Sequence, residues 1–421
     1  MSGSRKKYAV IGLGARVGMF LEAMVGRFQD HCEIVGFCDT NLTRLKYYNR
    51  LLGKKFGIQP VPTYPATDFD TMLREHKPDV VLVATIDRTH HLYITRAMEL
   101  GCDVITEKPM TIDVEKCRAI FDAIERTRRT LRVAFNYRYS PARTTVKDLL
   151  MKDTIGAVKS VHFEWLLDTR HGADYFRRWH RDKRNSGGLM VHKATHHFDL
   201  VNWWLDSAPH TVVGLGSLAF YGKANAEARG ISKFYERSTG ASNAEGDPFA
   251  LDLRSTEELR GLYLDAEHED GYRRDQSVFG DGISIEDTMN VLVRYRNGAQ
   301  MSYSLTAYSP WEGYRIGFNG TKGRIEFNEI EAMEGATPSQ QIMVFPHWQK
   351  PYPVEIPASI GGHGGGDIPL VEHLFGNPPP DPYRRAASHI DGARSILTGI
   401  AANLSFATGQ LVEIDRLFSL P

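Results

Sequence analysis

Short apolar runs alternate with amphipathic stretches through the first third of the chain, and this alternation limits the fold more than any other feature. The runs start at residues 8, 33, 79, 103 and 131 and read YAVIG, EIVGF, DVVLVA, DVIT and LRVAF. Val, Ile and Leu dominate them, as in parallel strands that are covered on both faces. Repeated strand-helix-strand units of this kind predict a doubly wound parallel sheet over residues 1–130.

A glycine-rich turn, GLGARVG at 12–18, directly follows the first run. In a dinucleotide site the first glycine makes the tight turn, and the second lets the backbone approach a pyrophosphate at the N-terminus of the next helix. The third glycine stands at 18 rather than 17, and taken alone the pattern fits a plain structural turn equally well. In its strand context, we expect cofactor contacts from Gly12, Gly14, Ala15, Arg16 and Val17.

Asp39 ends the second run, where an acidic side chain accepts hydrogen bonds from the ribose hydroxyls of the adenosine. A carboxylate there repels a 2′-phosphate, so we expect NAD as the cofactor, with NADP disfavoured. A helix N-cap before residues 41–50 is the structural alternative. Arg44 and Lys46 are also close enough in sequence to reach a phosphate.

Composition narrows the class of protein. At 421 residues the chain is long enough for two domains. Its 51 basic and 51 acidic side chains balance, which gives no electrostatic reason to expect a nucleic-acid partner. The 4 cysteines include no CxxC pair, and neither a signal-peptide pattern nor a run of about 18 apolar residues is present. We therefore expect a cytoplasmic protein without a membrane segment.

Residues 131–421 show a different pattern, with alternating runs such as SVHFEW and MNVLVRYRNGAQMSYSLTAY. Asn297-Gly298 between two such runs predicts a hairpin. We expect an α+β domain on a large, mainly antiparallel sheet that binds substrate and associates with other copies, as a homodimer or homotetramer. The polar segment 221–286 interrupts it as an insertion or lid.

Two segments mark the ends of the third and fourth runs. ATIDRTHH covers 84–91, and Glu107-Lys108-Pro109 ends the fourth run, which directs Lys108 to the crevice where open α/β sheets bind ligands. These segments resemble the Gfo/Idh/MocA oxidoreductase family, which typically shows ATPNxxH followed by EKP. Ile86 and Asp87 stand where the family has proline and asparagine. Family-like segments continue in order at 136–142, 156–165, 186–205, 319–327 and 391–414.

The resemblance implies an N-terminal Rossmann domain, a second domain on a large sheet, and an NAD(P)-dependent dehydrogenase that acts on CH–OH groups. It also implies cofactor contacts from Thr85, Asp87, His90, Glu107, Lys108, Asn136 and Arg138.

GGLMVHKATHHFD at 187–199 carries the expected acid-base groups. The segment 191–205 contains no Gly or Pro and is predicted to be one helix, so His192 and His196 share a face, as do Lys193 and His197. The family usually has an acid four places before a histidine. The resemblance therefore makes His196 the proton acceptor beside Lys108, places His192 where the acid stands, and leaves Lys193 as a further donor.

Other roles for these residues remain open. The alternative role for His196 and His197 is that of buried histidines at the domain interface. No metal is expected, because HxxxH alone lacks the further ligands of a zinc site. The polar segment 168–188 interleaves aromatic and basic residues that suit a sugar ring, although a solvated loop has the same composition. HGGGD at 363–367 either brings His363 to the substrate or forms a tight turn. Expected substrate contacts are Tyr137, Trp179, His180 and His197.

The predicted function is hydride transfer between nicotinamide and a secondary hydroxyl of a sugar, cyclitol or glycoside, with Lys108 and His196 near the reacting oxygen. Histidine suits the removal of the hydroxyl proton at neutral pH, and the lysine ammonium stabilises alkoxide charge. A redox-assisted glycosidase or lyase that recycles bound NAD needs the same residues and is the alternative. A non-catalytic NAD(H) sensor is the third hypothesis.

Overall fold

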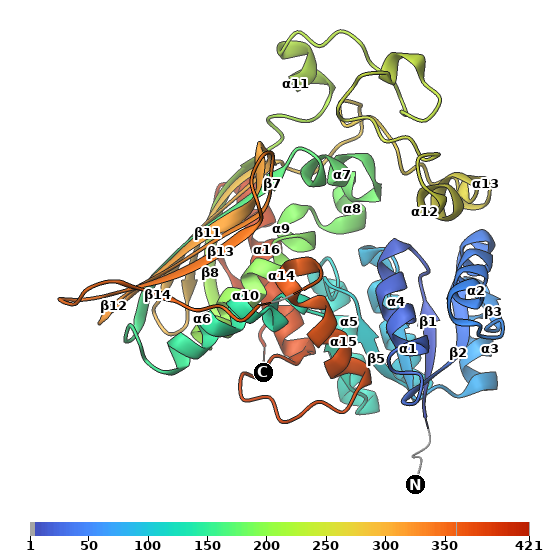
Figure 1. Ribbon diagram of the computed structural model, residues 1–421, viewed down its shortest axis with the longest axis horizontal. Helices are drawn as coiled ribbons and strands as arrows, with labels where there is room; N and C mark the ends of the chain where they lie inside the picture. Colours follow the sequence, from blue (N-terminus) through green and yellow to red (C-terminus); the bar gives the residue numbers. More distant parts are fainter. Residues whose placement is uncertain (1–4, 359, 421) are drawn as a thin grey trace.

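The computed structural model describes residues 5–358 and 360–420, which form two sheets with their helices (Figure 1). The first sheet has seven strands in the order β15-β6-β5-β4-β1-β2-β3, parallel except at β15. Its strands are β1 (Lys6–Ile11), β2 (Cys32–Asp39), β3 (Thr63–Pro65), β4 (Val80–Val83), β5 (Asp103–Thr106), β6 (Leu131–Val133) and β15 (Ala387–Ser388). The predicted doubly wound sheet is confirmed. It reaches slightly past residue 130 and gains β15 from near the C-terminus.

Helices cover both faces of this sheet, which explains why its strands are apolar throughout. All four residues of β4 are buried. The helices are α1 (Gly18–Val25), α2 (Leu42–Phe56), α3 (Phe69–His76), α4 (His90–Glu99) and α5 (Val114–Thr127).

The second sheet has nine strands in the order β14-β13-β12-β11-β7-β10-β9-β8-β16, antiparallel except for the pair β7 and β10. Its strands are β7 (Val158–Asp168), β8 (Pro209–Ser217), β9 (Thr288–Tyr295), β10 (Gln300–Ser309), β11 (Trp311–Gly320), β12 (Gly323–Met333), β13 (Ser339–Pro346), β14 (Tyr352–Val354) and β16 (Val412–Glu413). The large, mainly antiparallel sheet is confirmed. So is the hairpin at Asn297-Gly298, where Gly298 has a φ of 86° and joins β9 to β10.

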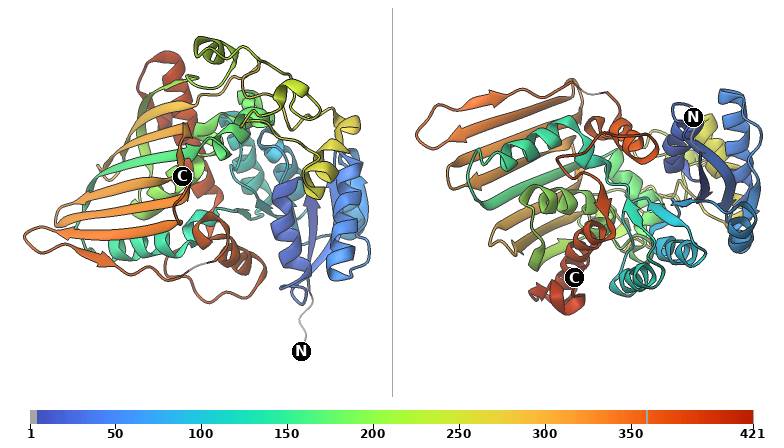
Figure 2. Two further views of the ribbon diagram at one scale, coloured as in Figure 1. Left: turned by 45° about the horizontal axis from the view of Figure 1, so that its top comes forward. Right: turned by 90° about the horizontal axis from the view of Figure 1, so that it is seen from below.

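Helices α6 (Pro141–Met151), α10 (Thr195–Leu205) and α16 (His389–Thr408) pack on one face of this sheet (Figure 2). Alternate residues of β9 and β10 are buried beneath them. On the opposite face Leu215 and Leu292 are exposed. The shorter helices are α7 (His171–Arg177), α8 (Lys183–Ser186), α14 (Gly362–Gly365), α15 (Asp367–Phe375) and α17 (Ile414–Leu417).

The prediction of a single helix over 191–205 is wrong. The structure has α9 (Leu189–His192), then a turn at Lys193 and Ala194, then α10. Ala194 N donates to Leu189 O, one residue further back than in an α-helix, so the backbone widens there. Tertiary packing accompanies the break, because α9 approaches α16 so closely that a Cβ on Gly399 would lie 2.3 Å from Met190 O.

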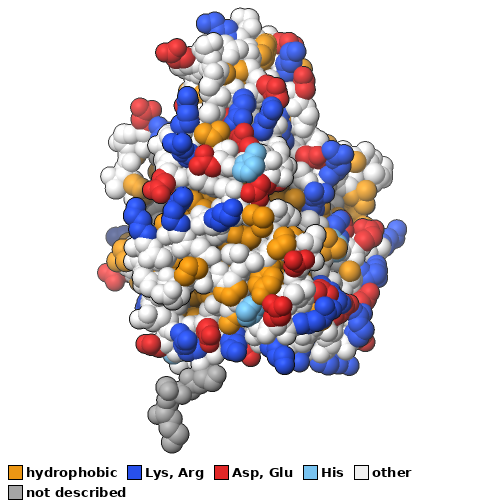
Figure 3. Space-filling model, turned by 90° about the vertical axis from the view of Figure 1, so that its right-hand side faces the viewer, with side chains coloured by type: hydrophobic (Ala, Val, Ile, Leu, Met, Phe, Trp, Pro, Cys, Tyr) orange, Lys and Arg blue, Asp and Glu red, His pale blue; other side chains and the backbone are white. Residues whose placement is uncertain are grey.

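The segment 221–286 leaves the large sheet after β8 and returns to it at β9. It carries α11 (Lys223–Ala228), α12 (Glu257–Leu259) and α13 (Glu267–Asp270). Figure 1 shows α12 and α13 beyond the end of α2, so the insertion spans from one half of the molecule to the other. On the face that Figure 3 presents, basic and acidic side chains are interspersed. Within the described part of the chain, no helix is long and apolar enough to cross a membrane.

Candidate active site between the two halves

Lys108 follows β5 at the carboxyl end of the parallel sheet and reaches across to the second half of the molecule. Its Nζ lies 3.2 Å from the carbonyl oxygen of His192 and 3.3 Å from His192 Nε2. An ammonium group has three donors, so two of them have partners on His192 and one remains for a third group. The structure thus brings together an ammonium from the end of the parallel sheet and an imidazole from α9.

Asp87 lies on the other side of the same imidazole. Its Oδ2 is 2.5 Å from Nδ1 of His192, and both side chains are buried. These contacts are compatible with one tautomer, in which Nδ1–H donates to Asp87 and Nε2 accepts from the Lys108 ammonium. The side chains of Asp87, His192 and Lys108 therefore form one hydrogen-bonded row, in which burial raises the pKa of the Asp87 carboxyl well above its usual value while Lys108 opposes the shift.

Burial changes the protonation of this row. It lowers the pKa of Lys108 to about 8, although Asp87 and Glu107 oppose the shift. Burial and the Lys108 cation also hold the pKa of His192 well below its usual value. At neutral pH His192 is therefore uncharged, while Lys108 remains mostly protonated.

His196 lies near Lys108 but makes different contacts. Its ring stacks on Tyr137 with centroids 4.2 Å apart, and its Nδ1 is buried without a hydrogen-bond partner among the described residues. Burial, followed by the Lys108 cation, keeps its pKa well below the usual range. A buried polar atom without a partner is costly, so this nitrogen lacks a compensating contact within the described residues.

Further aromatic and basic side chains surround these groups. Lys193 Nζ donates to the Tyr137 hydroxyl at 3.2 Å. His180 stacks on Trp179 at 3.6 Å and meets the His192 ring edge-on at 4.2 Å. The segment 168–188 therefore does contribute to the same site.

The HGGGD loop joins the site to the glycine turn. Asp367 accepts from Asn136 Nδ2 at 2.6 Å, lies 2.9 Å from His363 Nδ1 and pairs with Arg16 at 3.5 Å. Arg16 also pairs with Glu107 at 2.7 Å. The His363 ring is 5.7 Å from that of Tyr137, so the loop places this imidazole beside the cluster.

The glycine turn is shaped for a bound dinucleotide. Gly12 has a φ of 90°, and a Cβ there would lie 2.5 Å from Thr85 N, so a side chain is excluded. At Gly14 a Cβ would meet nothing within 4 Å, so the turn faces open space beside its backbone. Val17 packs into the core beneath the turn. A pyrophosphate fits against such a surface at the start of a helix.

Asp39 lies at the end of β2, beside the same turn. Its carboxylate accepts from Leu13 N at 2.6 Å and from Asn41 N at 2.8 Å. Thr40 Oγ1 donates to it as well, at 3.4 Å. A carboxylate accepts about four hydrogen bonds, so Asp39 retains capacity for about one from a ribose hydroxyl. The residues present therefore fit NAD, which supplies a hydride acceptor when bound.

Comparisons with known proteins decide the family. Residues 6–135 match the family model described as "Oxidoreductase family, NAD-binding Rossmann fold", and residues 147–414 match "Oxidoreductase family, C-terminal alpha/beta domain". The chain belongs to the Gfo/Idh/MocA oxidoreductase family. It is an oxidoreductase whose residues 6–135 form an NAD-binding Rossmann domain.

Several relatives place the chain within the Gfo/Idh/MocA family. The putative oxidoreductase YteT of Bacillus subtilis is 37% identical over 440 residues and covers 99% of each chain. D-glucoside 3-dehydrogenase of Escherichia coli is 27% identical over 158 residues, which are 38% of this chain and 42% of that protein. The WlbA dehydrogenase from Bordetella pertussis, solved with NADH and UDP-GlcNAcA, shares the fold with a TM-score of 0.64 and 18% identity, covering 99% of each chain.

Three residues predicted for ligand contacts in this Gfo/Idh/MocA protein have partners within the protein, and their ligand contacts stay predictions. Arg138 is buried and forms ion pairs with Asp199 at 2.6 Å and Asp391 at 3.0 Å, so it links the short 3₁₀ turn Asn136–Tyr139 to α10 and α16. His90 is 2.8 Å from Pro109 O and 3.0 Å from Thr85 O, and thereby links the two loops that flank Lys108. His197 is 2.6 Å from the Tyr303 hydroxyl and stacks on Trp165 inside the sheet core.

Sequence reasoning missed two contributors. Asp367 connects Arg16, Asn136 and His363, and the glycine-rich HGGGD segment was its visible signal. Tyr263, on the insertion, places its hydroxyl 3.4 Å from Ala15 N of the glycine turn. No local pattern marks Tyr263, because its contact joins residues 248 positions apart.

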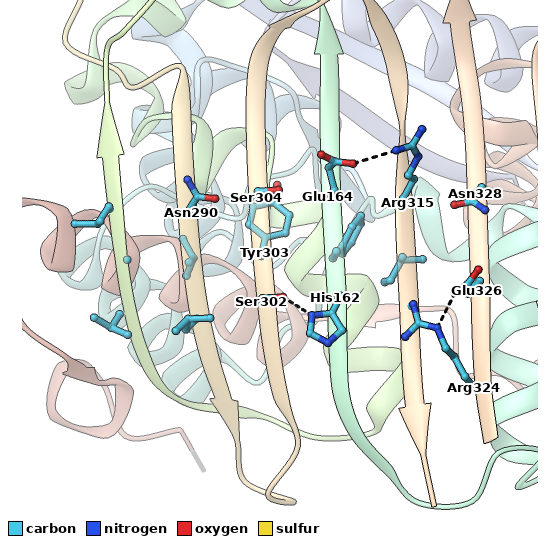
Figure 4. A pocket seen from close by; sticks show the side chains of 18 of the residues that line it. His162, Glu164, Asn290, Ser302, Tyr303, Ser304, Arg315, Arg324, Glu326 and Asn328 are labelled. Carbon is cyan, nitrogen blue, oxygen red and sulfur yellow. Dashed lines mark hydrogen bonds and ion pairs between the residues drawn. The ribbon is translucent and has the colours of Figure 1, made fainter. Parts of the chain in front are cut away.

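A second concave region lies on the open face of the nine-stranded sheet, away from the Lys108 site (Figure 4). It encloses about 710 Å³ and is lined by strand residues that include His162, Glu164 and Arg315. Glu164 pairs with Arg315 at 4.0 Å across neighbouring strands. None of the residues proposed for catalysis lines this region, so it is a separate surface.

Proposed function

We propose that this chain is an NAD-dependent dehydrogenase that transfers a hydride between nicotinamide and a secondary hydroxyl of a sugar, cyclitol or glycoside. The main support for this proposal is the contact between the Lys108 ammonium and His192. It brings groups that can bind and transfer protons to the carboxyl end of the parallel sheet, where the nicotinamide ring is expected. The partial likeness to D-glucoside 3-dehydrogenase supports a carbohydrate substrate.

Lys108 and His196 act at the reacting oxygen in this proposal. Two donors of Lys108 are held by His192, and the third binds the substrate oxygen and stabilises negative charge there. The unpartnered Nδ1 of His196 accepts the hydroxyl proton as the carbon is oxidised. In the reverse direction the same nitrogen returns the proton to the carbonyl oxygen.

Asp87 and His192 are positioning residues. A neutral His192 that donates from Nδ1 to Asp87 presents only its Nε2 lone pair to Lys108. The hydrogen bond to Nε2 fixes the position of the Lys108 ammonium. Because the His192 ring is uncharged, it does not neutralise the ammonium. The family's usual acid is absent at position 192, and the carboxylate comes instead from position 87, where the family has asparagine.

The cofactor preference is proposed to be NAD, through Asp39. The experiment that tests the function is a panel of sugars, cyclitols and glycosides incubated with the purified chain and NAD while NADH absorbance is followed. Net NADH formation supports the dehydrogenase. Glycoside cleavage without net NADH formation would contradict the dehydrogenase proposal and support the redox-assisted glycosidase or lyase.

We also propose that the open face of the nine-stranded sheet joins a second copy, giving a homodimer or homotetramer. Leu215 on β8 and Leu292 on β9 are 74% and 57% exposed there, and the Glu164 and Arg315 pair lies on the same face on β7 and β11. Subunit interfaces typically combine apolar patches with polar and charged side chains. A twofold axis brings the same patch of both copies together, so the charges of one copy can meet their opposites. The cytoplasmic location remains a prediction.

A further inference from the structure

The insertion 221–286 packs directly on the adenosine end of the cofactor site. Leu262 and Tyr263 share a buried apolar cluster with Leu45, Tyr47 and Tyr48 of α2. Gly261 lies so close that a Cβ there would be 2.6 Å from the Tyr47 ring. The insertion is therefore seated on α2 rather than merely lying near it.

Glu269 of the insertion occupies the N-terminus of α2. Its carboxylate accepts hydrogen bonds from Leu42 N, from Thr43 N at 3.0 Å and from Thr43 Oγ1 at 2.6 Å. Partial burial opposes ionisation, but these hydrogen bonds prevail and lower the pKa of Glu269. Free amides and the helix dipole make this end of a helix attractive to anions, and here the protein supplies the anion itself.

Asp270 holds the nearby basic side chain. Arg44 Nη1 is 2.8 Å from Asp270 and 3.8 Å from Asp39, and Arg44 Nε donates to Leu262 O at 3.1 Å. Arg44 Nη2 is buried without a hydrogen-bond partner among the described residues, so one donor is still free. The guanidinium that would otherwise pair with a phosphate is thus neutralised from the insertion.

The loop between β2 and α2 is tied to the insertion as well. Asn41 Nδ2 donates to Ala266 O at 2.8 Å, while Asn41 N donates to Asp39. The position of the ribose-binding carboxylate therefore depends on a segment 225 residues away in sequence.

We propose that the insertion completes the cofactor site and excludes NADP. Two groups would bind a 2′-phosphate, the N-terminus of α2 and the guanidinium of Arg44. Glu269 occupies the first, and Asp270 pairs with the second. The inference rests on the proposed NAD cofactor and deepens it. A phosphate group carries about −1.5 to −2 charges at pH 7, and it would meet three carboxylates, those of Asp39, Glu269 and Asp270. Selectivity between two similar ligands commonly depends on such a repulsive element.

The test measures the dissociation constants of NADH and NADPH on the purified full-length chain by fluorescence titration. Glu269→Gln combined with Asp270→Asn is expected to improve the affinity for NADPH relative to NADH by at least about tenfold, which is about 1.4 kcal/mol. Glu269→Gln alone is expected to move the ratio in the same direction, which keeps the test usable if the double variant does not fold. Glu245→Gln, at an exposed position of the same insertion, is the matched control and leaves the ratio unchanged.

Two results would overturn the inference. One is an unchanged affinity ratio in a folded double variant, and the other is a wild-type chain that prefers NADPH. Neither result depends on turnover. A failure of the dehydrogenase proposal would instead appear as normal NADH binding without any substrate oxidation.

Discussion

Asp87 Oδ2 lies 2.5 Å from Nδ1 of His192, although 105 residues separate the two in sequence. Each residue differs from its family's usual residue, asparagine at position 87 and an acid at position 192. The carboxylate at this site is thus supplied by position 87, at the end of the parallel sheet, and not by position 192 on α9. The two departures compensate one another physically, since the site keeps one carboxylate and gains an imidazole.

This compensation predicts the behaviour of single and double variants. Asp87→Asn removes the acceptor for Nδ1–H, so we expect kcat to fall by about 10²-fold, with a smaller change in KM. Adding His192→Asp restores the family's residue at both positions, and the double variant is expected to be more active than Asp87→Asn alone. Steady-state kinetics with Asp87→Glu as a conservative control check this. Simple addition of the two losses would argue against the coupling.

Lys108→Ala and His196→Ala are each expected to lower kcat by at least about 10², because each removes a group that acts on the reacting oxygen. NADH should still bind, as measured by fluorescence titration. Lys54→Ala, at an exposed position of α2, is the control and should retain normal turnover. Activity near that of the wild type in either test variant would remove that residue from the mechanism.

The pH profile should report the ammonium of Lys108. Burial lowers its pKa from 10.5 to about 8, so the charge is present below pH 8 and is lost as the pH rises through that value. We expect the rate of carbonyl reduction with NADH to decline above about pH 8. In the direction of alcohol oxidation, where His196 accepts the proton, burial holds its pKa well below 6.5, so no loss of rate from its protonation is expected down to about pH 6.5. A rate of carbonyl reduction that climbs through pH 8 would contradict the role of the ammonium.

Arg138→Ala should act on stability rather than on cofactor binding. The Arg138 and Asp199 side chains are 2% and 1% exposed, so removing one partner leaves a buried charge unpaired. The expected loss is about 3–5 kcal/mol in the free energy of unfolding, measured by denaturant titration. Arg184→Ala, whose side chain is 89% exposed, should change it by less than about 0.5 kcal/mol. A stable Arg138→Ala variant with weakened NADH binding would instead indicate that Arg138 contacts the cofactor.

Leu292→Glu should disrupt self-association through the open sheet face. A charge introduced on the apolar part of an interface loses its hydration on association, so the subunits are expected to separate. Light scattering after size-exclusion chromatography measures the mass. Leu92→Glu, a comparably exposed leucine on α4 at 54%, is the control. An oligomer that survives Leu292→Glu would place the interface elsewhere.

Several features could be read from the sequence because they depend on local patterns. Apolar periodicity predicted the parallel strands, Asn297-Gly298 predicted the hairpin, and the order of Asp39 after the glycine turn predicted a nucleotide-binding half. Each of these signals lies within a few residues or within one strand-helix unit. The break at Lys193 and Ala194 escaped the same reasoning, because periodicity cannot report how closely α9 approaches α16.

The sequence by itself determined the two-sheet architecture, the dinucleotide turn and the set of side chains available for acid-base chemistry. Only the tertiary structure decided that His192 rather than His196 contacts Lys108, that Asp87 orients it, and that Glu269 covers the start of α2. The reason is physical. Hydrogen bonds between residues 84 to 227 positions apart depend on how separately formed elements pack, and local patterns carry no record of that packing.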